Sequence, residues 1–216
     1  MRVINLSHPI SPDTPVMPLQ PAVEVTVIDS TEEALPGGSG TYNTAKLTIS
    51  LHTGTHLSAP FRFLQGSLTI DQVPLERCFG PAYILRHPIH TPLQPITPED
   101  IVPHRRHIEG RSVLLFHTGW SRHWGEETYF TEHPYLTLEA TSLLIEWCIH
   151  LVGVDFPSID HFPFAGYIEL LNQNVLVVQN LTNMEIVLSE KVDFLAIPLQ
   201  IVDREGSPVR AIAIDP

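Results

Sequence analysis

Hydrophobic and polar residues alternate strictly over residues 47–52. The apolar positions are leucine or isoleucine at every second residue, and the last polar position is His52. A period of two predicts a half-buried strand over residues 47–52. The strand leads into Thr-Gly-Thr, where Gly54 permits a tight bend that most other residues would resist.

Other short apolar runs, bounded by glycine, proline or polar residues, also predict strands. The C-terminal run predicts a β-hairpin, because two apolar segments flank the polar residues 204–207. The predicted strands cover residues 23–28, 82–85, 112–116, 152–154 and 175–178, and the hairpin covers residues 194–202 and 209–214.

Helical spacing of apolar residues appears mainly in the second half of the chain. Thr97 begins a typical helix start, with proline in the first turn and acidic residues near the positive end of the helix. Thr137 is predicted to cap the clearest helix, with Trp147 in the core. Shorter helices are predicted over residues 70–78 and 166–171. The apolar stripe of the helix after Thr137 is Ala140, Leu143, Leu144, Trp147 and Leu151.

This mixture of strands and helices, without an internal repeat or linker, predicts one mixed α/β domain over residues 1–216. Residues 32–41 contain Pro-Gly-Gly-Ser-Gly and predict a surface loop. A lid or an arm of a dimer is the functional alternative for this loop.

Composition narrows the partners and the compartment. The hydrophobic fraction of 43% suits a globular core, and the formal net charge is −12 without a cluster of Lys or Arg. This argues against nucleic acids and anionic membranes as partners. The two cysteines, Cys78 and Cys148, form no disulfide framework and suit a reducing cytoplasm. No leader sequence and no apolar run near 18 residues is present, so we expect a soluble cytoplasmic protein.

His52 and His56 are four residues apart at the end of the predicted strand. In an extended chain they would be separated by roughly 13 Å, too far to act on one atom. They converge only if the chain folds back at Gly54, and we predict that it does. The chain has 12 histidines, so this spacing alone does not establish a functional site.

The sequence His52-Thr53-Gly54-Thr55-His56, followed by Ala59-Pro60, resembles the core of the cyclase family, which includes bacterial kynurenine formamidases and isatin hydrolases. The family core reads H-x-G-T-H-x-D-x-P-x-H and supplies most ligands of a divalent metal site. Further resemblances lie in order at residues 4–10, 113–120, 152–160 and 180–183. The resemblance implies a single mixed-sheet domain of the swivelling β/β/α type and a homodimer or higher homo-oligomer.

Four positions depart from the family pattern. Ser58 replaces the aspartate of the core, and Arg62 replaces its third histidine. Tyr167 is nearest in spacing to the family's helical histidine, and Gln179 replaces a glutamate before Asn-Leu. Zinc or manganese prefers several neutral-imidazole or anionic ligands, and an arginine would bring a fixed positive charge to the ion. We therefore expect no metal; His52 and His56 are the ligands if one binds.

Without a metal, the candidate general acids and bases are His52 and His56. Ser58 is either a nucleophile activated by histidine or a small residue that fills space. Arg62 either polarises a carbonyl or binds a carboxylate, or it is an ordinary surface residue. Tyr167 and Gln179 are candidate substrate-binding donors. Trp120 and Phe63, with Trp124, are candidates to line an aromatic pocket or simply to pack, and His161 is a candidate replacement ligand.

Three functions remain open from the sequence. The preferred one is a small-molecule enzyme with little or no metal that hydrolyses an amide, lactam or lactone, or catalyses a related cyclisation or dehydration. The second is an arylformamidase-type metal hydrolase with unorthodox ligands. The third is an inactive relative that binds a ligand or a protein partner.

Overall fold

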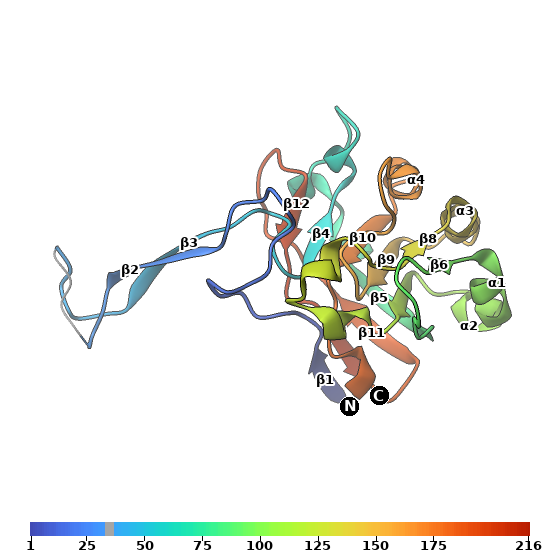
Figure 1. Ribbon diagram of the computed structural model, residues 1–216, viewed down its shortest axis with the longest axis horizontal. Helices are drawn as coiled ribbons and strands as arrows, with labels where there is room; N and C mark the ends of the chain where they lie inside the picture. The colour runs from blue at the N-terminus through green and yellow to red at the C-terminus, as the bar shows by residue number, and fades with distance from the viewer. Residues whose placement is uncertain (33–36) are drawn as a thin grey trace.

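The computed structural model describes residues 1–32 and 37–216, and these residues form a mixed sheet of nine strands (Figure 1). The strand order is β1-β13-β11-β5-β7-β9-β10-β4-β12. The four central strands, β5, β7, β9 and β10, are parallel, and the pairs outside them are antiparallel. The strands are β1 Arg2–Asn5, β4 His56–Ser58, β5 Phe79–Arg86, β7 Val113–His117, β9 Leu151–Val154, β10 Leu176–Gln179, β11 Lys191–Leu195, β12 Gly206–Pro208 and β13 Ile212–Asp215.

The central strands are covered on both faces, as parallel strands usually are. In β7, Val113 and Leu115 face one hydrophobic cluster, and Leu114 and Phe116 face the other. The second cluster receives apolar residues from the helices, which gather on one side of the sheet in Figure 1. The four strands predicted at 82–85, 112–116, 152–154 and 175–178 are confirmed, with ends shifted by a few residues.

The described part of the chain has four α-helices. Thr137 caps α3 by accepting a hydrogen bond from the amide of Ala140, as predicted. Asp100 accepts from the amide of Thr97, which confirms the helix start there. The helices are α1 Pro98–Ile101, α2 Arg105–Ile108, α3 Leu138–Glu146 and α4 Ala165–Asn172; the short 3-10 helices are Pro60–Arg62, Ile70–Gln72, Leu75–Arg77, Val102–His104, Trp120–His123, Glu127–Phe130 and Met184–Ile186.

Two helix predictions need correction. Residues 70–78 form two 3-10 turns rather than one helix, because Pro74 donates no hydrogen bond and Val73 before it is extended. The apolar stripe predicted for α3 extends too far, because the helix ends at Glu146. Trp147 is half-buried at the margin of the core, with the guanidinium of Arg105 5.5 Å from its ring, and Leu151 belongs to β9.

The predicted C-terminal hairpin is wrong in part. β11 and β13 do pair antiparallel. The residues between them cross to the far edge of the sheet, where β12 pairs with β4. Pro208 is tolerated there because an edge strand needs fewer amide donors. This crossing places residues 205–208 beside the histidine motif.

An arm extends from the body (Figure 1), made of β2 Glu24–Asp29 and β3 Thr44–Thr48. β2 confirms the strand predicted at 23–28. The strand predicted over residues 47–52 is right only for its first two residues, because β3 ends at Thr48 and residues 49–55 form no strand. The loop predicted at 32–41 falls partly on residues 33–36, which lie outside the described residues. β6 Pro95–Ile96 and β8 Tyr135–Leu136 form a further small parallel pair.

Both cysteines are free thiols; Cys78 is buried and Cys148 is exposed. Among the described residues, no helix combines the length and the apolar character needed to span a bilayer.

Asp155 anchors the turn after β7. Its fully buried carboxylate accepts hydrogen bonds from the amide of Gly119 at 2.7 Å, the amide of Thr118 at 2.9 Å and the hydroxyl of Thr118. Burial raises the pKa of Asp155 to about 6, against the opposing effect of these donors.

We predict that Asp155→Asn lowers the free energy of unfolding by about 2–4 kcal/mol, because the new NH2 group would face amide donors and leave one of them unpaired. The folded pKa lies above the ordinary value of 3.8, so the folded state binds more protons between pH 4 and 6. The wild type therefore gains stability as the pH falls through this window, and the variant lacks this gain. Denaturant titrations of the wild type and the variant at pH 4 and at pH 6 measure the free energy of unfolding. Exposed Asp13→Asn is the control, and equal stability of all three proteins would contradict the prediction.

Candidate functional site

The chain folds back at Gly54 and brings two imidazoles together. Gly54 has a φ of +62°, in the left-handed region that favours glycine. Its carbonyl oxygen accepts a hydrogen bond from Nδ1 of His56 at 2.9 Å. The ring centroids of His52 and His56 lie 4.9 Å apart, edge to face. The predicted fold at Gly54 is thus confirmed, although His52 lies in a turn and His56 begins β4.

Asn180, directly after β10, holds this turn in place. Its Nδ2 donates to the carbonyl of Gly54 at 2.8 Å, and its own carbonyl accepts from the hydroxyl of Thr55 at 2.6 Å. Its Oδ1 accepts from the hydroxyl of Tyr129 at 2.9 Å. Asn180 adopts a φ of +57° and is almost completely buried. The sequence analysis noted this residue only as part of a motif, because its partners are about 50 and 125 residues away.

Both imidazoles are neutral near pH 7. His56 is buried, and its pKa is well below the ordinary value, because of desolvation first and then repulsion from His52 and Arg62. The pKa of His52 is also lowered by desolvation, although Glu205 acts in the opposite direction. A neutral imidazole offers one nitrogen lone pair that can accept a proton.

Ser58, Tyr167 and Gln179 form one buried hydrogen-bonded group beside His56, which pairs with Gln179 across β4 and β10. Oε1 of Gln179 accepts from the hydroxyl of Tyr167 at 2.8 Å and from Ser58 at 3.4 Å. Nε2 of Gln179 donates to the carbonyl of Pro157. Both the oxygen and the nitrogen of the Gln179 amide are therefore hydrogen-bonded, and the oxygen accepts from two hydroxyl groups. Ser58 is completely buried, and its hydroxyl lies 3.4 Å from Oε1 of Gln179, which favours the space-filling alternative for this serine.

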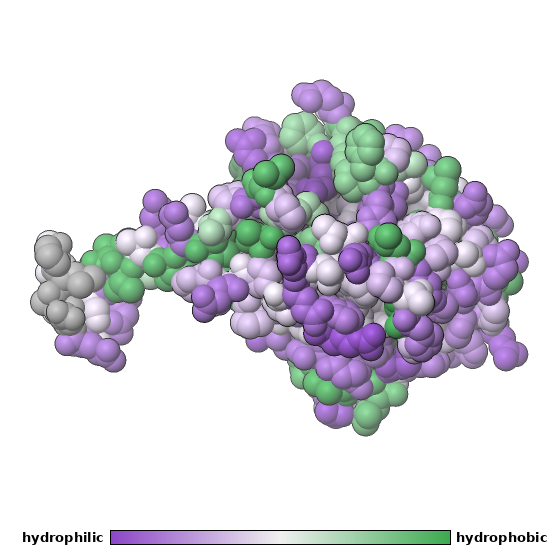
Figure 2. Space-filling view, viewed as in Figure 1, coloured by the Kyte–Doolittle hydropathy of each residue, from purple (hydrophilic) through white to green (hydrophobic). Residues whose placement is uncertain are grey.

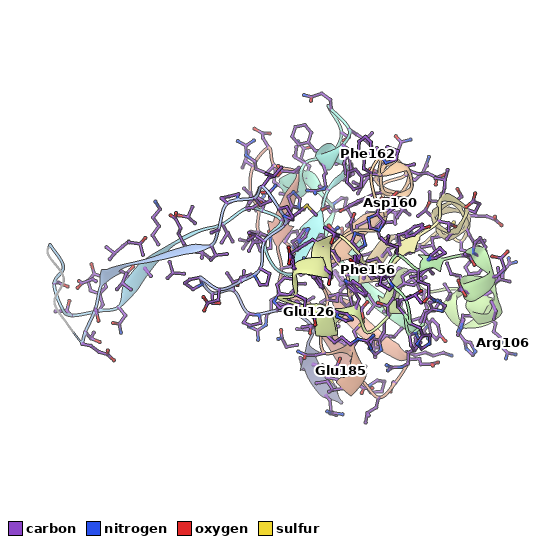
Figure 3. The ribbon with its side chains drawn as sticks, in the orientation of Figure 1. Arg106, Glu126, Phe156, Asp160, Phe162 and Glu185 are labelled. Atoms are coloured by element: carbon purple, nitrogen blue, oxygen red, sulfur yellow. The ribbon has the colours of Figure 1, made fainter. Side chains whose placement is uncertain are left out.

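Tyr167 is positioned by the start of α4. Asp160, beside α4 in Figure 3, accepts from the amides of Gly166 at 2.8 Å and Tyr167 at 3.3 Å. The ring of Phe63 packs edge-on against Tyr167, with centroids 5.2 Å apart. Phe63 therefore lies beside the buried polar group.

Arg62 is the cation of the site. It is half-buried, its Nε has no hydrogen-bond partner among the described residues, and its guanidinium lies 5.5 Å from the ring of Phe63. Its charge contributes to lowering the pKa of both site histidines and of Glu205. The surface alternative for Arg62 therefore does not describe its position.

Glu205 belongs to the site and was missed by the sequence analysis. Its Oε1 lies 3.3 Å from Nε2 of His52, within ion-pair distance but without the alignment of a good hydrogen bond. This contact, with the charges of His52 and Arg62, lowers the pKa of Glu205 to about 2. No local pattern could have revealed it, since about 150 residues separate the partners and only the crossing to β12 joins them.

Other candidates lie away from this group. Trp120 is buried in the helix-side core and donates to the carbonyl of Tyr129 at 3.1 Å, and Trp124 stacks on His8 with centroids 4.0 Å apart. Both arrangements favour packing over pocket lining. His161 contacts the carbonyl of His133 at 3.1 Å and stacks on that ring. It is not in place to be a third ligand.

The donor set does not fit the divalent metal that the family resemblance implies. Within residues 1–32 and 37–216, no three His, Cys, Asp or Glu side chains converge as a metal site would need. Oε1 of Gln179 already accepts from both Ser58 and Tyr167, and none of these three neutral groups supplies an anionic ligand. Arg62 adds a positive charge that a cation would meet unfavourably.

Comparisons with known proteins agree with the motifs. The Cyclase family model matches residues 4–161. The kynurenine formamidases of Bacillus cereus and Bacillus anthracis are 31% and 30% identical over 212 residues, covering 97% of this chain and 95% of theirs. The structure of isatin hydrolase A from Labrenzia aggregata, bound to benzyl benzoate, superposes with a TM-score of 0.86 at 24% identity and covers 99% of this chain and 93% of that chain.

A structure described as a potential metal-dependent hydrolase with cyclase activity superposes with a TM-score of 0.79 at 23% identity, over 100% of this chain and 98% of that chain. At these identities the structural matches establish the fold, a single α/β domain with a mixed sheet of nine described strands. The sequence matches go further, and this chain belongs to the cyclase family.

Proposed function

We propose that residues 1–216 form one cyclase-like domain and that it is a small-molecule enzyme that works without a divalent metal. Its substrates carry an amide, lactam or lactone bond, as the names of the related kynurenine formamidases and isatin hydrolases suggest. The observation that carries the proposal is the bonding of Gln179. Its amide accepts from Tyr167 and Ser58 and donates to the carbonyl of Pro157, so three positions where the family resemblance leads us to expect metal ligands carry neutral groups that are hydrogen-bonded through Gln179.

In the proposed hydrolysis, a neutral imidazole of the His52–His56 pair takes one proton from water as the water oxygen bonds to the carbonyl carbon. The guanidinium of Arg62 stabilises the negative charge that develops on the carbonyl oxygen. When the carbon–nitrogen or carbon–oxygen bond breaks, the imidazolium returns the proton to the leaving atom. A cyclisation or dehydration would use the same groups. Water is the nucleophile, because the hydroxyl of Ser58 is directed to Gln179.

Metal content is the first test. In protein purified without added metal, we expect elemental analysis to find zinc and manganese far below one ion per chain, and a chelator to leave turnover of formylated anilines, isatin-like lactams or lactones unchanged. One tightly held ion per chain would support the metal hydrolase instead. No turnover of any of these substrates would support the binding protein.

Arg62→Ala should lower kcat/KM by roughly 100-fold or more, because the developing oxyanion loses its positive partner. The melting temperature should change little, since Arg62 is half-buried and has no ion-pair partner within 4 Å among the described residues. Exposed Arg106→Ala on α2 is the matched control (Figure 3). Unchanged turnover of the Arg62 variant would remove this residue from the mechanism.

Gln179→Glu restores the carboxylate that relatives with the family pattern carry. Here it should lower the free energy of unfolding by about 1–3 kcal/mol at pH 7, because an ionised oxygen would face the carbonyl of Pro157. Burial raises the pKa of such a carboxyl, and its protonated form can donate to that carbonyl, so stability should recover as the pH falls toward 5. Denaturant titration at both pH values tests this, with exposed Gln20→Glu as control. A variant as stable as the wild type at pH 7 would show that the site accepts a carboxylate.

We also propose that the protein is a homodimer that buries the arm. Val25 pairs with Leu47 and Val27 with Ala45, so these four side chains share one face of the β2–β3 ribbon. Val25, Val27 and Leu47 are 45%, 54% and 50% exposed, and Figure 2 shows hydrophobic residues along the arm. An isolated two-stranded ribbon is at best marginally stable in water, so a second copy would supply the missing contact.

Val25→Lys combined with Leu47→Glu should convert the dimer to a monomer, because it places charge on the apolar face while keeping a favourable cross-strand pair. Analytical ultracentrifugation at micromolar concentration measures the mass. Thr26→Glu places the same kind of pair, opposite Lys46, on the polar face and should leave the mass unchanged. A monomeric wild type, or an unchanged mass in the double variant, would refute the proposal.

A further inference from the structure

A cavity of about 820 Å³ borders the histidine turn. Its walls come from the segments 5–10, 182–183, 197–199 and 208–210. Pro208 in one wall pairs with His56 across β12 and β4, but none of the lining residues that the structure describes belongs to the candidate site itself. Cavities of this size hold small organic molecules in many proteins. The protein therefore has room for a second ligand outside the histidine site.

Backbone hydrogen bonds hold the walls of the cavity together. The amide of Thr182 donates to the carbonyl of Leu6 at 3.0 Å, and the amide of Leu6 donates to the carbonyl of Ala211 at 2.9 Å. The amide of Val209 donates to the carbonyl of Thr55 at 3.0 Å. Segments that are far apart in the sequence are thus fixed to one another, so the cavity is part of the folded framework.

Arg210 supplies a cation to the wall. Its Nε donates to Oδ1 of Asn5 at 2.6 Å, which orients the guanidinium. Arg210 forms no ion pair within 4 Å in the described part of the chain, and no Asp or Glu lies among the lining residues. In a chain with 24 acidic residues and 12 Lys and Arg, a cavity wall that holds a cation and no acid favours an anionic ligand.

The other polar groups of the wall are neutral. The ring of His8 stacks on Trp124 with centroids 4.0 Å apart, and burial lowers the pKa of His8 to about 4. Its imidazole is therefore uncharged at pH 7. The hydroxyl of Thr182 makes no hydrogen bond to the residues that the structure describes and can donate to a ligand. Arg210 is thus the charged lining residue at this pH.

Apolar side chains form the remaining wall. Ile10, Ile197 and Leu199 line the cavity and are exposed. An inorganic anion such as phosphate would leave this apolar surface in water. A carboxylate attached to a hydrocarbon body would cover it and gain from its burial. The combination of one cation and an apolar wall therefore selects an organic acid.

We propose that this cavity binds a small organic acid. The carboxylate accepts hydrogen bonds from the terminal NH2 groups of Arg210 and from the hydroxyl of Thr182. The hydrocarbon body of the acid lies against Ile10, Ile197 and Leu199. This binding site goes beyond the proposed function and does not depend on it, because it uses none of the residues assigned to the reaction.

Isothermal titration calorimetry of the full chain at pH 7 tests the charge requirement. The probes are benzoate and benzamide, which have nearly the same shape and differ in charge. We expect benzoate to bind at one equivalent and benzamide to bind roughly 10-fold more weakly or less, because only the carboxylate makes charge-assisted hydrogen bonds. Equal affinity for the two probes, or no binding of benzoate, would overturn the inference.

Variants locate the binding site. Arg210→Gln should weaken benzoate binding by roughly 10- to 100-fold, since it removes hydrogen bonds to a charged group. Arg210→Lys should fall between this variant and the wild type, because it keeps the charge but loses the planar guanidinium. Exposed Arg106→Gln on α2 is the matched control and should bind as the wild type does.

Two further variants separate the alternatives. Leu199→Asp places a negative charge in the wall and should weaken benzoate binding without removing any donor. Arg62→Gln should leave the Arg210-dependent binding unchanged. An affinity that follows Arg62 instead of Arg210 would place the carboxylate in the histidine site and overturn the inference. If Arg210→Gln lowers the melting temperature, Arg210→Lys and Leu199→Asp decide the outcome.

The source of the acid is tested with the best substrate found. The hydrolysis of an amide, lactam or lactone releases a carboxylate. If that product binds more tightly than benzoate and depends on Arg210, the cavity holds the product; if it binds no better, the cavity serves a different acid. The inference and the proposed function fail separately, because benzoate binding requires no turnover, and its loss would leave metal content and the effect of Arg62→Ala unaltered.

Discussion

The hydrogen bonds of Asn180 are the constraint on which the candidate site depends. One side chain binds the carbonyl of Gly54 and the hydroxyl of Tyr129, and the backbone of the same residue binds Thr55. All of these groups are buried, so each would cost about 1–3 kcal/mol if left without a partner. The left-handed conformation of Asn180 turns the chain out of β10 at the point where these bonds form. The end of a central parallel strand thereby fixes the turn that carries both histidines.

This constraint determines the electrostatics of the site. Because the turn is fixed, His52 and His56 share a buried space, and each disfavours a proton on the other. Desolvation lowers the pKa of both rings most, and the permanent positive charge of Arg62 adds to this effect. Among the described residues, Glu205 is the carboxylate within ion-pair distance of His52, and it is more exposed than that imidazole. The positive charge of Arg62 and the negative charge of Glu205 are opposite, and both act on His52.

The sequence predicted much of the fold, because most of its signals are local. The apolar runs that became β5, β7, β9 and β10 are buried on both faces, and Thr137 caps α3 with its own side chain. The alternation in residues 47–52 misled because it continues the pattern of the exposed arm, where Leu47 faces solvent instead of a core. The sharp fold at Gly54 was predictable, since one glycine separates two histidines that otherwise diverge.

The contents of the site were only partly predictable. His52, His56, Ser58 and Arg62 lie within eleven residues, and a motif suffices to suggest that they act together. Gln179 and Tyr167 became visible only through their resemblance to a family pattern. Glu205 has neither kind of signal, because it reaches His52 through a chain crossing from β11 to the opposite edge of the sheet. Local patterns predict which segments pair when burial decides the pairing, but they do not predict which edge a short polar strand will join.

The hydrogen bonds of Gln179 differ from the contacts that a residue at this position would make in a metal site. A metal centre needs several lone pairs directed at one point, with few protons among them. Here the hydroxyls of Tyr167 and Ser58 direct their protons at the single acceptor of Gln179, and the amide protons of Gln179 turn outward to Pro157. In the proposed metal-free site, Gln179 therefore binds its protein neighbours through both ends of its amide.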